Sequence, residues 1–212
     1  MKIIFDFDHT VFDMTTMHQS IVDAIKKLGI DEEKYLHAYR EVTNWKIFTV
    51  DSISQRLNRV LNVSPEDVSK AFHSVAEEAL LYVYDDVDEH FQMLKDKGHK
   101  LYLLSWGDKD WQHKKIEHSS LMKHCEDIMT VQEVKAEYLS KNHEQHECLV
   151  LIDDKPAELK AVKEVKPDLK MIRLRRENGK YSDIETPHDI PEAKNMAEVV
   201  KIVSEMKCAL HD

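Results

Sequence analysis

Four short apolar segments, separated by longer helical stretches, limit what this chain can fold into. They are Lys2–Phe7, Lys100–Ser105, Cys148–Ile152 and Leu169–Leu174. Their apolar residues follow one another without alternation, which is typical of parallel strands covered by helices on both faces. A weaker segment, Ile128–Val131, is a candidate fifth strand. The alternation of strands and helices predicts an α/β fold with a doubly wound, Rossmann-like parallel sheet.

The stretches between the later strands carry helical signals, as the connections of such a sheet should. Val87–Lys97 repeats apolar residues at helical spacing and ends before a glycine, and Pro156–Val165 ends shortly before a proline. Lys109–His118 and Asn195–Lys207 are also predicted helices, whereas Arg175–Pro191 is predicted to be a long surface connection.

The stretch from Met14 to Tyr84 contains no convincing strand and is predicted to be helical. Within it, Ser64 and Pro65, followed by two acids, are typical of a helix start. We therefore expect an α-helical cap domain over residues 14–84, inserted into an α/β core that comprises residues 1–13 and 85–212. The predicted cap helices are Ser20–Leu28, Glu32–Val42, Ser52–Leu61 and Pro65–Leu81.

The composition narrows the class of protein. With 212 residues, 42% of them hydrophobic, the chain can bury a large core, and only 4 glycines and 5 prolines favour a helix-rich fold. A net charge of −10 disfavours nucleic-acid binding. No stretch approaches the ~20 apolar residues of a membrane span, so we expect no membrane partner. Because Cys125, Cys148 and Cys208 form no CxxC pair, we interpret them as thiols in a reducing compartment and expect a cytoplasmic protein.

Polar side chains follow three of the predicted strands at the point where each strand ends. Asp6 and Asp8 close the first strand, Ser105 closes the second, and Asp153 and Asp154 follow "CLVLI". In an open parallel sheet, ligands bind outside the carboxyl ends of the strands, so these groups should share one edge. Carboxylates that lie close together repel one another and need a compensating charge. Oxygen ligands beside a phosphate suit Mg²⁺, so we predict a magnesium site there.

The same residues carry a resemblance to a known family. "DFDHTVFD" resembles the first motif of the haloacid dehalogenase superfamily, "LLSWGD" is similar to its second motif, and "LVLIDDKP" resembles its acidic fourth motif. The third motif of the family is a single lysine between the last two, for which Lys135 is the best-placed candidate and Lys109, Lys141 and Lys155 are rivals. The helical insert resembles the smaller type of cap in this family, and the resemblance covers essentially the whole chain.

The resemblance implies a Mg²⁺-dependent phosphatase, because acids at both positions of the first motif mark that branch, whereas the dehalogenase branch lacks the second acid and needs no metal. Asp6 would be the nucleophile that forms an aspartyl-phosphate. Asp8 would be the general acid and then the base that activates water. Ser105 and Lys135 would contact the phosphoryl group.

The resemblance also implies the metal ligands. The Asp6 side chain, the Asp8 backbone carbonyl and Asp153 would hold Mg²⁺, with Asp154 acting directly or through water. Two residues depart from the family pattern. His9 stands where the family most often has glycine, and Trp106 follows the second-motif serine, where smaller residues are usual.

The expected substrate is a small phosphorylated metabolite, because a cap closes over a small ligand more easily than over a macromolecule. Trp45, Arg40 and Arg56 are the candidates in the cap for selecting the phosphate ester. The alternatives are a phospho-accepting signalling domain, in which the acidic pair would follow the first strand and the acceptor a later one, and a non-catalytic binding module of the same fold. The sequence does not indicate which ester is used or the oligomeric state.

Overall fold

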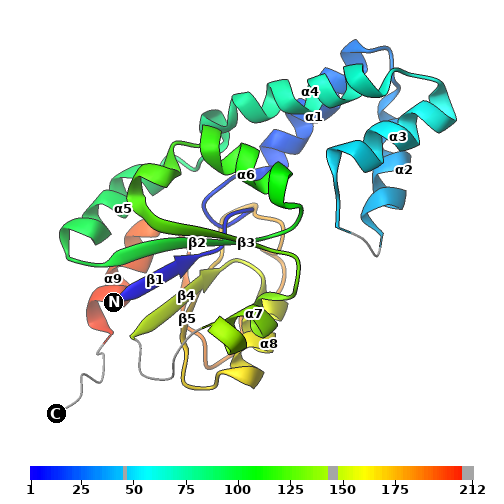
Figure 1. The fold of residues 1–212 in the computed structure, drawn as a ribbon. Coiled ribbons are helices and arrows are strands. Elements are labelled where there is room, and N and C mark those ends of the chain that lie inside the picture. The colour runs from blue at the N-terminus through cyan, green and yellow to red at the C-terminus, as the bar shows by residue number, and fades with distance from the viewer. Residues whose placement is uncertain (45–46, 143–147, 207–212) are drawn as a thin grey trace.

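A parallel sheet in the order β3-β2-β1-β4-β5-β6 forms the centre of the molecule (Figure 1). The computed structural model describes residues 1–44, 47–142 and 148–206. Every predicted strand is present, with its ends no more than three residues from the predicted ones, and a two-residue strand at the edge of the sheet was not predicted. The strands are β1 Lys2–Phe5, β2 Lys100–Trp106, β3 Cys125–Val131, β4 Leu149–Asp153, β5 Lys170–Leu174 and β6 Glu192–Ala193.

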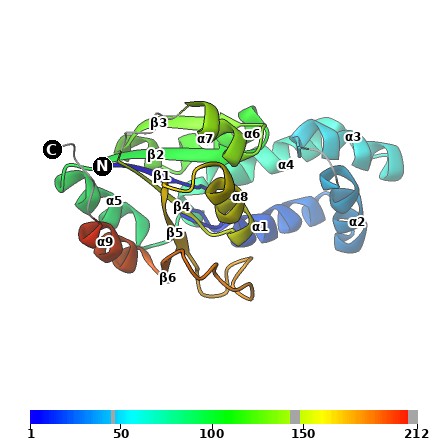
Figure 2. The ribbon, with the colours of Figure 1, turned by 90° about the horizontal axis from the view of Figure 1, so that it is seen from below.

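Helices cover both faces of the sheet, as the unbroken apolar strands require (Figures 1 and 2). Successive side chains of β1 point to opposite faces, so Ile3 and Phe5 belong to one hydrophobic cluster and Ile4 to the other. The first cluster includes residues of α5 Val87–Asp96, α6 Lys109–His118 and α9 Met196–Glu205. The second includes residues of α7 Lys135–Asn142 and α8 Pro156–Val165.

A helical region lies between β1 and α5 and extends away from the sheet (Figure 1). Its helices are α1 Met14–Lys27, α2 Glu32–Thr43, α3 Val50–Leu61 and α4 Pro65–Glu77, followed by the 3₁₀ turn η1 Ala79–Tyr82. Helix α1 begins earlier than predicted because the Asp13 side chain accepts hydrogen bonds from the Thr15 and Thr16 backbone N–H groups. That residues 14–84 form a separate cap domain stays a prediction.

The chain leaves the sheet for the helical region and returns to it at adjacent points. The backbone N–H of Asp13 donates to the Tyr82 carbonyl at 2.6 Å, and that of Tyr84 donates to the Val11 carbonyl at 3.2 Å. Phe12 and Val83 form an isolated antiparallel bridge between the two connections. The two connections therefore run side by side and are hydrogen-bonded to each other.

The cysteines depart in part from the prediction of three thiols. Cys125 is a free thiol, and burial raises its pKa to about 12. Cys148, by contrast, is disulfide-bonded, so the prediction is wrong for this residue. Cys208 lies outside the described residues. None of the helices in the described ranges has the length and apolar character needed to cross a membrane.

Candidate active site

The register of the sheet brings the predicted strand ends together. β1 lies between β2 and β4, and Phe5 is level with Ile152. The Asp6 backbone N–H donates to the Ile152 carbonyl at 2.8 Å, so Asp6 and Asp153 leave neighbouring strands at the same height. Ser105 lies near the end of β2 on the other side of β1. Parallel pairing alone is therefore sufficient to gather these groups at one edge.

Asp6, Asp153 and Asp154 form a buried cluster of carboxylates. One oxygen of each lies within 4.8 Å of one oxygen of each of the others. Thr10 connects two of them, since its hydroxyl lies 3.2 Å from both Asp6 Oδ2 and Asp154 Oδ1 and accepts a hydrogen bond from the Asp154 backbone N–H at 3.0 Å. The threonine of the first motif thus holds the ends of β1 and β4 together.

Lys135 supplies a positive charge inside this cluster. Its Nζ contacts Asp6 Oδ1 and lies 2.6 Å from Asp153 Oδ2, and the side chain is 5% exposed. Of the rival lysines, Lys141 pairs with Glu137 on the surface of α7 and Lys109 is exposed. Lys135 is therefore the predicted lysine that the fold brings to the carboxylates.

The fourth predicted lysine lies in the wall of the same pocket, but it has a different partner. Lys155 pairs with Glu158 at 3.0 Å, while its backbone N–H donates to Asp153 Oδ1 at 2.8 Å. Its backbone N–H helps to orient Asp153, whereas its ammonium group pairs with Glu158.

Burial shifts the pKa values of the cluster away from their ordinary range. Burial raises the pKa of Asp6 to about 7, against the opposing charge of Lys135, and the negative charge of Asp153 adds to the rise. Burial also raises the pKa of Asp154 to about 8, with the charges of Asp6 and Asp153 contributing. For Lys135, burial acts to lower the pKa, but the adjacent carboxylates of Asp153 and Asp6 outweigh it and raise the pKa.

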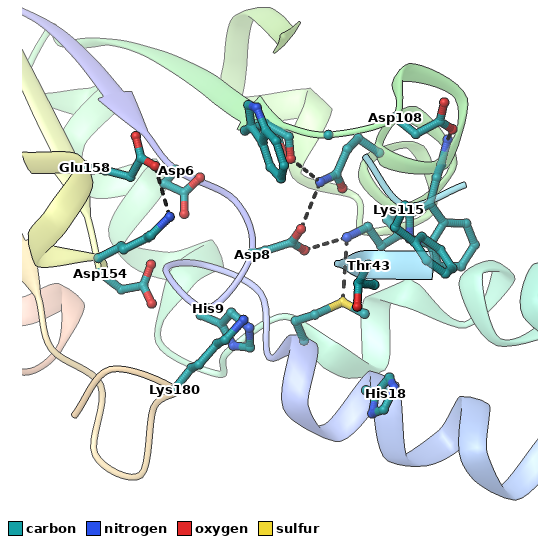
Figure 3. A pocket seen from close by; sticks show the side chains of 18 of the residues that line it. Asp6, Asp8, His9, His18, Thr43, Asp108, Lys115, Asp154, Glu158 and Lys180 are labelled. Carbon is teal, nitrogen blue, oxygen red and sulfur yellow. Dashed lines mark hydrogen bonds and ion pairs between the residues drawn. The ribbon is translucent and has the colours of Figure 1, made fainter. Parts of the chain in front are cut away.

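Asp8 lies in the same pocket but has separate partners (Figure 3). Its Oδ1 is 2.5 Å from Lys115 Nζ, and its Oδ2 accepts a hydrogen bond from Gln112 Nε2 at 2.9 Å. Burial acts to raise the pKa of Asp8, but Lys115 and Gln112 outweigh it and lower the pKa. The Asp8 carboxylate is thus outside the three-carboxylate cluster, and a metal contact through its backbone carbonyl stays a prediction.

Lys115 and Gln112 were not among the predicted site residues. Both come from α6, on the face that also carries Trp111. Lys115 is 1% exposed, and a lysine on the buried face of a helix was the signal in the sequence that could have identified it. Gly107, with φ of 147°, leaves room for Gln112, because a Cβ there would lie 3.0 Å from Gln112 Nε2.

The two residues that depart from the family pattern both line the pocket. His9 has φ of 64°, a left-handed conformation that glycine adopts without strain, which explains the glycine usual at this position. Burial lowers the pKa of His9 to about 4, so its imidazole is neutral near pH 7. Trp106 is 45% exposed and donates to the Gln132 carbonyl at 3.1 Å. Ser105, beside it, is buried, and its hydroxyl has no partner within the described part of the chain.

The pocket has a volume of about 380 Å³ and lies between the sheet edge and the helical region. All six predicted site residues line it, namely Asp6, Asp8, Ser105, Lys135, Asp153 and Asp154. Of the cap candidates, Arg40 and Arg56 are not part of its wall, and Arg56 pairs with Glu41 instead. Trp45 lies outside the described residues. A cavity of this size suits a small organic ligand.

A family comparison identifies the chain. The sequence model described as haloacid dehalogenase-like hydrolase matches residues 3–166, which include all six predicted site residues. The chain belongs to the haloacid dehalogenase-like hydrolases. A search of curated proteins finds no match to this hydrolase.

Solved structures share the fold of this haloacid dehalogenase-like hydrolase along its whole length. A protein of Burkholderia xenovorans, assigned as a haloacid dehalogenase-like hydrolase, has a TM-score of 0.76 at 17% identity, with 96% of each chain covered. YfnB of Bacillus subtilis, assigned as a HAD-hydrolase and bound to magnesium, has a TM-score of 0.66 at 16% identity, with 95% and 97% covered. L-2-haloacid dehalogenase of Xanthobacter autotrophicus, with chloropropionic acid covalently bound, has a TM-score of 0.65 at 11% identity, with 97% and 99% covered.

The raised pKa of Asp6 predicts that Asp6→Asn stabilises this hydrolase in metal-free buffer at high pH. Because the pKa of Asp6 is higher in the folded chain than its ordinary value of 3.8, ionisation of this carboxyl favours unfolding. Its contribution to the free energy of unfolding is therefore fully present below pH 3.8 and is lost as the pH rises through about 7. The variant avoids this loss, so its melting temperature should exceed that of the wild type at pH 8.5, by more than it does at pH 5, where the loss is only partial. A gain of about 1 kcal/mol corresponds to roughly 2–4 °C. Asp23→Asn, on the exposed surface of α1, is the control, and an equal difference at both pH values would contradict the prediction.

The Lys115–Asp8 pair generates a second prediction about stability. Lys115→Met leaves the Asp8 carboxylate, whose side chain is 26% exposed, without its cation. Removing one partner of a largely buried pair should lower the free energy of unfolding by about 2 kcal/mol, measured by urea denaturation. Lys114→Met is the matched control, because its partner Glu77 is 56% exposed and exposed pairs contribute about 0–1 kcal/mol. Equal losses in the two variants would mean that the buried pair contributes no more than the exposed one.

Proposed function

We propose that this chain is a Mg²⁺-dependent phosphatase that hydrolyses a small phosphorylated metabolite through an aspartyl-phosphate on Asp6. The observation that carries the proposal is the buried cluster of Asp6, Asp153 and Asp154 at the floor of a small-molecule pocket. The magnesium bound to the structurally similar YfnB supports it further.

The donor set of the cluster fits a hard divalent cation. Three carboxylates and the single ammonium of Lys135 leave two negative charges without compensation when all are ionised. The buried Oδ2 of Asp154 has no partner within the described part of the chain, so it remains available as a ligand. Asp6, Asp153 and Asp154 would hold Mg²⁺, which supplies positive charge for the transferring phosphoryl group when bound.

The residues of this chain divide the chemistry between them. An oxygen of the Asp6 carboxylate forms a bond to phosphorus as the bond from phosphorus to the ester oxygen breaks. The departing oxygen takes a proton from Asp8 and leaves as an alcohol, and water, which gives a proton back to Asp8, then cleaves the aspartyl-phosphate to release inorganic phosphate and restore Asp6. Asp8, kept ionised by Lys115 and Gln112 in this structure, is suited to accept the proton of that water.

Two further groups face the phosphoryl position. The buried Ser105 hydroxyl, without a partner within the described residues, is available to donate to a phosphoryl oxygen. The ammonium of Lys135 is already beside Asp6 and would offset the repulsion between that carboxylate and an anionic substrate. These two groups and Asp8 complete the predicted catalytic set.

Dehalogenation is the competing activity, since L-2-haloacid dehalogenase of Xanthobacter autotrophicus has the same fold. The acids of this chain favour the phosphatase. The dehalogenase branch of the family lacks the second acid of the first motif and needs no metal, whereas here Asp8 lines the pocket beside the three-carboxylate cluster.

We predict that phosphate release requires Mg²⁺. The purified protein should hydrolyse p-nitrophenyl phosphate with Mg²⁺, lose this activity with a chelator, and regain it when Mg²⁺ is added back. Mg²⁺ should also raise the melting temperature, because an ion that binds only the native state stabilises it by mass action. With 2-chloropropionate we expect no release of chloride. Full phosphatase activity in metal-free buffer would contradict the role of the metal, and chloride release would assign the chain to the dehalogenases.

Substitution of Lys135 tests the arrangement around the nucleophile. Lys135→Ala should lower kcat/KM for p-nitrophenyl phosphate by roughly a hundredfold or more, because a charge-assisted contact to the reacting group contributes a few kcal/mol to transition-state stabilisation. Lys141→Ala on the same helix is the control and should remain close to the wild type, since Lys141 pairs with Glu137 at the surface. A nearly silent Lys135→Ala would remove this residue from the catalytic set.

A further inference from the structure

The pocket wall opposite the three-carboxylate cluster is built from aromatic rings. His18 of α1 and Thr43 at the end of α2 lie on this side of the pocket, across from Asp6 and Asp154 (Figure 3). The rings in this wall come from α1, α2, the segment before α3, α4 and α6. They are His18, Tyr39, Phe48, Phe72 and Trp111, and we call them the ring wall.

The rings of this wall pack against one another rather than lining the pocket singly. The ring centroid of Phe48 lies 5.4 Å from that of Tyr39, 5.8 Å from that of Phe72 and 6.2 Å from that of Trp111. Tyr39 continues the contact to His18 at 4.8 Å. These spacings are in the range of favourable aromatic pairs. Phe48 contacts three other rings and is therefore central to the wall. A planar ligand in the pocket would contact an aromatic surface that is already formed.

The described residues with charged side chains that line the pocket come from outside the helical region. Of the described residues, those that the helical region contributes to the pocket are aromatic, aliphatic or hydroxyl-bearing, apart from the imidazole of His18. Burial lowers the pKa of His18, with the charge of Lys180 contributing, which disfavours the charged form of this ring. Lys135 and Lys115 pair with the carboxylates, although Lys115 Nζ also lies 5.9 Å from the ring centroid of Trp111, and Lys180 is a further cation in the pocket wall. Substrate recognition by the helical region therefore relies on apolar contact rather than on ion pairs.

We propose that the organic group of the substrate carries an aromatic ring that packs against the ring wall, so that the substrate is a ring-bearing phosphomonoester rather than a sugar phosphate. This inference rests on the proposed phosphatase function. A polyol in contact with these rings would lose hydrogen bonds to water that the described part of the wall replaces with little more than the Thr43 and Tyr39 hydroxyls.

A matched pair of substrates tests the proposal. Benzyl phosphate and glucose 6-phosphate are both esters of a primary alcohol, so the chemical step is similar and the organic groups differ. With Mg²⁺, kcat/KM should be at least about tenfold higher for benzyl phosphate. A preference for glucose 6-phosphate, or equal rates, would overturn the ring proposal while leaving the phosphatase activity established.

Substitution of Phe48 tests whether the preference for a ring-bearing substrate arises from the ring wall. Phe48→Leu keeps an apolar side chain but removes the central ring, so kcat/KM for benzyl phosphate should fall about tenfold, whereas that for acetyl phosphate, which has no ring, should change less than twofold. Phe91→Leu is the matched control, because Phe91 packs on Phe5 in the core and is not part of the pocket wall. Equal losses on both substrates in Phe48→Leu would overturn the role of the ring wall.

A binding measurement separates this inference from the proposed function. If the wild type hydrolyses none of these esters, the phosphatase proposal fails, and calorimetry with benzyl phosphate and glucose 6-phosphate then tests the ring wall alone. Tighter binding of benzyl phosphate by the wild type, weakened in Phe48→Leu and retained in Phe91→Leu, supports the ring proposal. Equal binding of the two esters overturns it.

Discussion

The ammonium group of Lys135 lies between two buried carboxylates, Asp6 and Asp153, which neighbouring strands bring to the same height. Without this cation, the sheet edge would concentrate the negative charges of three buried acids, at a cost in desolvation and repulsion. With it, the cluster is still deficient in positive charge. The clustered carboxylates therefore destabilise the folded chain, and for the same reason they favour the binding of a divalent cation together with an anionic group.

Much of the fold and of this edge could be predicted from the sequence because strand ends are local signals. An apolar run that stops in Asp6, Ser105 or Asp153 identifies both the strand and the polar group after it, and parallel pairing then brings the groups together without further information. Lys135 was predicted by its order along the chain, and the helix it begins directs it back to the strand ends. The two-residue strand β6 is too short to leave such a signal.

Groups that enter the site from a helix face were harder to predict, since their position depends on how the helix packs. Lys115 and Gln112 reach Asp8 only because α6 lies against the first motif, and "WQHKK" by itself is an ordinary polar helix. The ring wall has the same property. Its members come from several helices, and the arginines that seemed natural candidates for a phosphate ester, Arg40 and Arg56, are not part of the wall.

The paired connections at Asp13 and Tyr82 have a consequence for how such a protein diversifies. Because the chain departs and returns at two hydrogen-bonded neighbours, everything between them is a loop whose ends already meet. Exchanging that loop for another of different length adds little closure entropy and leaves the strand pairing of the sheet unchanged. Replacement of the one contiguous segment between the two connections can thus change ligand preference, while the acids at the sheet edge stay unchanged.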